Sequence, residues 1–184
     1  GCGSPIVAPV VGVVLELRRT DLWTQAVDDP AARGGIYVSI LGNDGVRYYM
    51  AHFSSLEPFL QPAAAVTAGQ LVGAMGRTGR AGACHLHFAL SPPCPTDDWW
   101  VRRGAIWPQV YLRDWQQGGN LSPAADVAAW LAANPQACTT PATDSRSGVS
   151  SAVGLQLWAA NSPARRVWLS TASVSRPHSG RGRS

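Results

Sequence analysis

The chain has 184 residues and 46% hydrophobic content, which suits one medium-sized domain, and it has no apolar run near the roughly 18 residues that a membrane-spanning helix needs. Residues 1–144 carry nine arginines and all eleven acidic residues, whereas residues 145–184 carry six arginines and no acidic residue. The net charge of +4 therefore comes from the C-terminal part, and we do not infer nucleic-acid binding from it.

The N-terminal part is predicted to form short β-strands. Residues 5–17 are rich in β-branched side chains, and Pro9 and Gly12 divide them into two strands around a turn. The polar residues 20–34 predict a loop.

A β-hairpin is predicted next. Two β-rich runs, at 36–41 and 46–52, flank Asn43-Asp44-Gly45, and Asx-Gly sequences are typical of tight hairpin turns. The two-residue period of the second strand places His52 on the same face as Tyr48. His52 then stands at the end of a strand, where functional side chains often lie beside a loop.

The segment that follows is rich in small residues. Residues 54–60, which begin Ser-Ser-Leu-Glu-Pro, are predicted to form a short turn or helix. The repeated glycines of 66–76 predict a tight turn and a short strand that crosses closely under a neighbour. Residues 77–83 predict a flexible loop; they lack the lysine and the spacing of a phosphate-binding loop, so we reject that function for them.

Two of the four histidines lie in Cys84–Leu90, where large apolar residues alternate with other residues at the period of a β-strand. One face of this strand is predicted to enter the core, while His85 and His87 share the other face about 7 Å apart. Such a pair can hold a metal, or one imidazole can bind the metal while the other transfers a proton.

The rest of the chain divides into an extension and a tail. Four tryptophans follow the histidine strand, and we expect them to cover the sheet rather than stack on sugars: Trp99, Trp100, Trp107 and Trp115. Ser122 and Pro123 predict the start of a helix at 123–133. We therefore expect a domain at 1–141 and a basic, disordered tail at 142–184.

The four cysteines allow three disulfide pairings, and the sequence does not choose between them. Cys84 and Cys94 flank one strand and can close a short ring, which leaves Cys2 and Cys138 as the second pair. Alternatively, Cys2 pairs with a residue outside the chain.

Six short motifs occur in order within residues 3–90. They are Gly-x-Pro-Ile-Val-Ala-Pro-x-x-Gly-Val-Val at 3–14, Asn-Asp-Gly at 43–45, Ala-His-Phe-Ser-Ser-Leu at 51–56, Val-Thr-Ala-Gly-Gln-Leu-Val-Gly at 66–73, Gly-x-Thr-Gly at 76–79 and His-Leu-His-Phe at 85–88. Each motif is weak alone, but the ordered set resembles the LytM/lysostaphin-type zinc metalloendopeptidases of peptidase family M23.

This resemblance implies a mainly β fold: a small antiparallel β-sheet or sandwich of the M23 type, crossed by a groove and followed by a C-terminal helix. It implies a secreted or cell-envelope bacterial enzyme that cuts peptidoglycan peptides or another peptide. It further implies that His87 is a ligand of one Zn²⁺ ion, and that His52 and His85 are catalytic histidines beside the zinc-bound water.

The resemblance is incomplete at the metal. The family's other two ligands, a His and an Asp, belong to a motif that would precede Gly1, so we expect an N-terminally truncated peptidase. The alternative is a degenerate, non-catalytic module that binds peptidoglycan or activates another hydrolase. A zinc site formed by His52, His85 and His87 alone is a third interpretation.

A biotinyl or lipoyl carrier domain is excluded because the chain has no lysine to modify. The sequence does not predict an oligomeric state.

Overall fold

The computed structural model describes residues 1–94 and 99–139, so the predicted tail at 142–184 lies outside the described residues. The described part is mainly β, with two antiparallel sheets and a few short helices, which confirms the predicted fold class. Among these residues, no helix has both the length and the apolar character that crossing a membrane requires.

The larger sheet has five strands in the order β6-β2-β3-β4-β8. They are β2 (Gly12–Arg18), β3 (Tyr37–Gly42), β4 (Arg47–Ala51), β6 (Ala65–Val66) and β8 (His87–Ser91). The smaller sheet has the order β1-β7-β5. It consists of β1 (Pro5–Val7), β5 (Phe53–Leu56) and β7 (Leu71–Met75).

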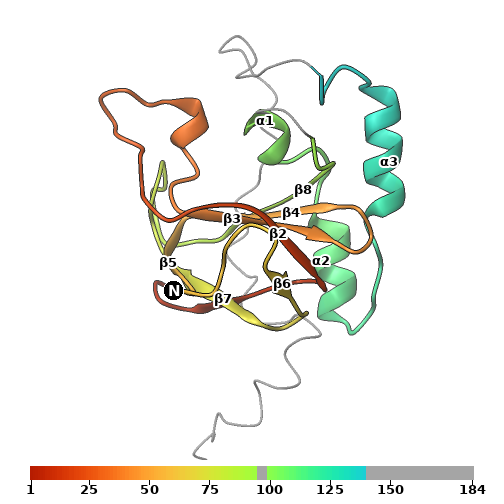
Figure 1. Cartoon of the computed structure of the whole chain (residues 1–184), viewed down its shortest axis with the longest axis horizontal. Coiled ribbons are helices and arrows are strands. Elements are labelled where there is room, and N and C mark those ends of the chain that lie inside the picture. The colour runs from red at the N-terminus through yellow and green to blue at the C-terminus, as the bar shows by residue number, and fades with distance from the viewer. Residues whose placement is uncertain (95–98, 140–184) are drawn as a thin grey trace, which may run out of the picture.

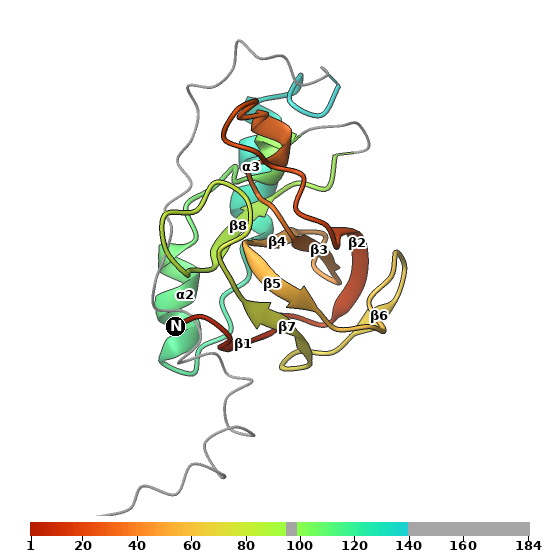
Figure 2. The same cartoon turned by 90° about the vertical axis from the view of Figure 1, so that its left-hand side faces the viewer.

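The main hydrophobic core lies between the two sheets, with the smaller sheet against one face of the larger (Figures 1 and 2). Ile6 and Val72 come from the smaller sheet and are fully buried. Leu86, Phe88 and Leu90 enter the same core from the histidine segment, as their alternation predicts. This apolar face fixes which way the intervening histidine side chains point.

The predicted hairpin is confirmed. β3 and β4 pair in antiparallel register from Tyr37 opposite Ala51 to Leu41 opposite Arg47. Gly45 in the connecting turn has a φ of +77°, which glycine adopts without steric cost.

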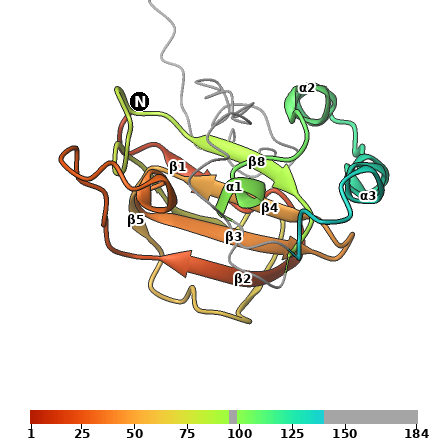
Figure 3. The ribbon, with the colours of Figure 1, turned by 90° about the horizontal axis from the view of Figure 1, so that it is seen from above.

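A short helix covers the opposite face of the larger sheet. This helix is α1 (Trp99–Arg102), and Figure 3 shows it over β3 and β4. The Arg102 guanidinium carbon lies 4.8 Å from the ring centroid of Tyr37, and its Nη1 forms an ion pair with Glu16 at 2.9 Å. Beneath the helix is a second buried cluster on the sheet: Tyr37, Tyr49, Ala51 and Ala89.

Two further helices lie along one edge of the sheets: α2 (Gln109–Gln116) and α3 (Ala124–Ala133). The sequence predicts α3 to within one residue, and Ser122 Oγ accepts a hydrogen bond from the Ala124 amide at 3.2 Å. Val127 joins the main core. The helix therefore packs on the domain through Val127.

The tryptophan prediction is confirmed only in part. Trp99 and Trp115 are buried, the latter against the main core. Trp107 is 47% exposed and therefore covers no core.

The predicted turn or helix at 54–60 is wrong at its start, where the chain forms strand β5. Phe53 and Leu56 are both buried, so this segment gains more from packing on the smaller sheet than from local turn structure. The backbone of β5 lies so close to Gly73 and Gly76 that these two positions have no room for a side chain. A Cβ atom on either glycine would collide with the backbone of Ser54 or Ser55.

We predict that Gly76→Ala lowers the free energy of unfolding by about 1–3 kcal/mol, because the added methyl group overpacks the approach to β5. Gly82→Ala is the matched control, since a Cβ there has no atom within 4 Å. Denaturant unfolding of both variants measures the difference. Equal stabilities would contradict the predicted close approach.

Candidate functional site

Three histidines from two separate segments of the chain meet on the α1 side of the larger sheet. The ring centroid of His52 lies 4.7 Å from that of His85 and 6.0 Å from that of His87. The structure therefore brings together all three of the site residues that the sequence singles out.

His52 occupies the junction between β4 and β5, where the chain passes from the larger to the smaller sheet. Its φ of +69° is uncommon for a residue with a side chain. This turn breaks the strand alternation, so the prediction that His52 shares a face with Tyr48 is wrong: Tyr48 enters the main core, whereas the His52 ring contacts the other histidines.

Three hydrogen bonds hold His52 in this conformation. Its backbone amide donates to Gly34 O at 3.0 Å, and its carbonyl accepts from the Gly76 amide at 2.9 Å. Its Nδ1 donates to Thr78 O at 2.7 Å. The Thr78 hydroxyl in turn donates to Phe53 O at 2.7 Å, so part of the loop predicted to be flexible is firmly attached beside the site.

His87 is the first residue of β8 and pairs with Ala51 of β4. Its side chain is only 7% exposed. The ring lies edge-on to Tyr49, with centroids 5.8 Å apart, and its Nε2 donates to Arg103 O at 3.0 Å. The chain that leaves α1 therefore fixes the orientation of this imidazole.

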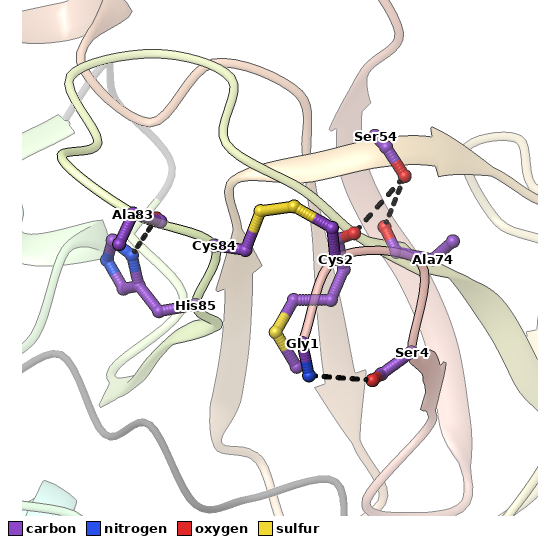
Figure 4. The surroundings of a disulfide bond; sticks show 9 residues. Gly1, Cys2, Ser4, Ser54, Ala74, Ala83, Cys84 and His85 are labelled. Carbon is purple, nitrogen blue, oxygen red and sulfur yellow. Dashed lines mark hydrogen bonds between the residues drawn. A yellow bond between two sulfur atoms is a disulfide. The ribbon is translucent and has the colours of Figure 1, made fainter.

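His85 lies just before β8, which begins three residues later than the sequence predicts. Its Nδ1 donates to Ala83 O at 2.9 Å. The preceding residue, Cys84, forms a disulfide with Cys2, as Figure 4 shows. The disulfide attaches the first residues of the chain directly to the histidine site.

The cysteine pairing differs from the short ring that we considered. Cys2 pairs with Cys84, and Cys94 pairs with Cys138. The second disulfide joins the end of β8 to the segment after α3, which sequence spacing alone does not indicate.

The three imidazoles share one chemical feature. Each uses one ring nitrogen to donate a hydrogen bond to a backbone carbonyl, which can only accept. In the neutral ring, the other nitrogen then carries a lone pair that is available to a proton or a metal. This second-sphere arrangement is typical of histidines that bind metals or transfer protons.

Burial keeps two of these rings neutral. It is the largest cause that lowers the pKa of His52 to about 4 and that of His87 to about 3; the hydrogen bonds to backbone carbonyls oppose this shift only partly. At neutral pH both rings are therefore unprotonated.

Two of the histidines, His52 and His87, border a cleft of about 260 Å³ that is strongly basic. Its lining residues are Arg33, Gly34, Tyr49, His52, Arg80, His87 and Arg103. None of them has a carboxylate. The sequence prediction missed the three arginines because they come from three separate segments and form no motif.

Paired glycines bring two of these segments together. Gly35 and Gly79 both have positive φ, and a Cβ atom on either would meet the backbone of the opposite segment. The Arg80 amide donates to Arg33 O at 2.9 Å across this contact. Both arginine side chains then bind Asp28, at 2.8 and 2.9 Å.

The described residues do not by themselves fit a zinc ion. Among residues 1–94 and 99–139, no three His, Cys, Asp or Glu side chains form a group that could hold a metal. The orientation of the His87 ring would suit a metal ligand. The three arginines that line the cleft, however, repel a metal cation.

The sequence model of peptidase family M23 matches residues 1–96, which is more than half of the chain. Comparison with curated proteins gave no match.

Several solved structures are similar to the chain. The catalytic domain of the antimicrobial peptidase lysostaphin from Staphylococcus simulans is 25% identical, with 61% of this chain and 73% of that chain covered and a TM-score of 0.48. A variant catalytic domain of the prophage-encoded M23 protein EnpA from Enterococcus faecalis is 24% identical, covering 51% and 63%, with a TM-score of 0.41. A zinc-containing peptidase from Vibrio cholerae is 24% identical, covering 48% and 23%, with a TM-score of 0.39. Because these TM-scores are below 0.5, the family assignment rests on the sequence model.

We predict that the free energy of unfolding falls as the pH is lowered from about 6.5 towards 4. Over this range the unfolded chain binds protons at His52 and His87 that the folded chain does not bind, because both pKa values are lowered on folding. Denaturant unfolding across this pH range tests it. His52→Gln and His87→Gln should each give a shallower pH dependence, and an unchanged slope in both variants would contradict the prediction.

We also predict that the two disulfides differ in their effect on the site. Replacing Cys2 and Cys84 by serine should shift the NMR resonances of the His85 ring and lower the free energy of unfolding by about 2–5 kcal/mol. Replacing Cys94 and Cys138 is the matched control, expected to reduce stability while leaving the His85 resonances in place. The opposite pattern would show that the first disulfide does not position this histidine.

Proposed function

The chain belongs to peptidase family M23, and from this premise we propose that its histidine site serves a zinc-dependent endopeptidase that acts on peptidoglycan peptides. The observation that carries the proposal is that the His52 ring lies close to those of both His85 and His87. Each of the three rings has one nitrogen left available by its bond to a carbonyl.

The three rings have different roles in this proposal. His87 would be a zinc ligand, because it is buried and its Nε2 is held by Arg103 O, which leaves Nδ1 available. His52 lies beside both His87 and His85, and His52 and His85 would accept and return the proton of the attacking water. The remaining zinc ligands would have to come from outside the described residues, which hold no group of three possible ligands.

The two disulfides support a location outside the cytoplasm. Disulfides form and persist in oxidising compartments, which include the cell envelope and the extracellular space. Peptidoglycan is accessible there, so the proposed substrate and the proposed location agree.

A second candidate function is a non-catalytic module that binds peptidoglycan or activates another hydrolase. It is favoured by the lack of a metal-binding group among the described residues and by the basic lining of the cleft. Zinc content separates the two proposals, because the module needs no metal.

We predict that, in the protein expressed from its complete gene, His87→Ala abolishes zinc binding. His52→Ala and His85→Ala should retain zinc but lose about 10²-fold or more in peptide hydrolysis, the typical contribution of a general acid or base. Metal analysis and hydrolysis of cross-linked peptidoglycan fragments measure both properties.

His178→Ala is the control for these variants, since His178 lies outside the described residues and we assign it no role. Equal zinc loss in all three cleft variants would contradict the separate roles. A complete wild-type protein without zinc or hydrolysis would favour the non-catalytic module.

A further inference from the structure

Arg103 is a partly buried cation without an anionic partner among the described residues. It follows α1 directly, and its guanidinium lies over the Trp99 ring at 5.8 Å from the centroid. The ion pairs in the described part of the chain engage Arg33, Arg80 and Arg102, but not Arg103. Burial is the largest cause that lowers its pKa, and the neighbouring arginines add to this effect. A desolvated cation in this setting favours a bound anion.

The cleft around Arg103 has an excess of positive charge. Arg33 and Arg80 also line it, and both bind the single carboxylate of Asp28. The lining itself has no carboxylate, so an incoming anion meets three guanidinium groups there, while Asp28 and the nearby Asp21 reduce but do not match this positive charge.

The available hydrogen-bond donors indicate the kind of anion. Because Asp28 already occupies Arg33 and Arg80, Arg103 is the cleft arginine whose guanidinium fork has no ion pair with another described residue. One fork matches a planar, singly charged carboxylate, which accepts two parallel hydrogen bonds. A phosphate dianion is best satisfied by more donors than one fork offers.

We propose that Arg103 binds a carboxylate of the peptide ligand, in the cleft beside His52 and His87. That the ligand is a peptide rests on the proposed function, whereas the binding of a carboxylate does not. The Arg103 carbonyl also holds the His87 ring, so one residue orients the imidazole and receives the anion. The geometry therefore selects peptides that carry a carboxylate close to the reacting bond.

The test compares N-acetyl-Ala-Ala with a free C-terminal carboxylate and the same dipeptide as its C-terminal amide. Binding is measured by NMR titration of the chain, with the His52 and His87 ring signals as local reporters. We expect the carboxylate form to bind at least about tenfold more tightly, as a charge-assisted hydrogen-bonded pair implies, and to weaken as salt is raised. Equal binding of the two peptides would overturn the proposal.

Three variants locate the effect. Arg103→Gln should lose the preference for the carboxylate, and Arg103→Lys should retain part of it. Arg113→Gln on α2 is the matched control, since Arg113 is exposed and does not line the cleft. If Arg103→Gln is folded and keeps the full preference, the assignment to Arg103 is wrong. If Arg103→Gln does not fold, Arg103→Lys replaces it in the test. A reduced carboxylate preference in Arg103→Lys then supports the assignment, and an unchanged preference contradicts it.

Two more probes identify the source of the anion. N-acetyl-Ala-Glu amide carries its carboxylate on a side chain, so tighter binding of this probe than of the dipeptide acid indicates a side-chain carboxylate as the ligand. Tighter binding of inorganic phosphate than of either carboxylate would overturn the proposal. None of these titrations requires zinc or hydrolysis. A failed titration therefore leaves the peptidase proposal intact, while a metal-free complete protein leaves carboxylate binding intact.

Discussion

The turn at His52 is the constraint on which the site depends. Its backbone adopts a left-handed conformation at the point where the chain leaves one sheet for the other. A residue with a Cβ atom in this conformation carries a steric cost of roughly 1–2 kcal/mol, which the surrounding structure must offset. The bonds to Gly34, Gly76 and Thr78 do so, and they direct the ring towards the other histidines. Such strain often accompanies functional positions.

The rest of the cleft is built from short segments joined at close contacts. Gly35 and Gly79 allow two loops to meet backbone to backbone, and this places Arg33 beside Arg80. The disulfide of Cys84 fixes the residue before His85, and α1 delivers the Arg103 carbonyl to His87. Each contact fixes one functional side chain, so the site combines groups that are distant in sequence.

Neutral histidines and cationic arginines have complementary roles in one cleft. Burial keeps the imidazoles unprotonated, which preserves their lone pairs for a proton or a metal. The arginines remain charged and make the same space attractive to an anion. A peptide that carries a carboxylate is therefore electrostatically suited to this cleft, and it would compensate the positive charge that disfavours a cation there.

The sequence by itself determined the local features. Alternation predicted that Leu86, Phe88 and Leu90 enter the core, the Asn-Asp-Gly turn predicted the hairpin, and Ser122 with Pro123 predicted α3, because each depends on neighbours along the chain. Ordered motifs identified the family and the three histidines.

Only the tertiary structure decided how these parts combine. The reversed face of His52, the strand at β5, the disulfide pairing and the meeting of Arg33, Arg80 and Arg103 all depend on contacts between distant segments. The physical reasons are tertiary: hydrogen bonds offset the strained backbone at His52, and burial of Phe53 and Leu56 overrides local turn preference. Close contact at Gly35 and Gly79 brings Arg33 and Arg80 together, which no spacing in the sequence indicates.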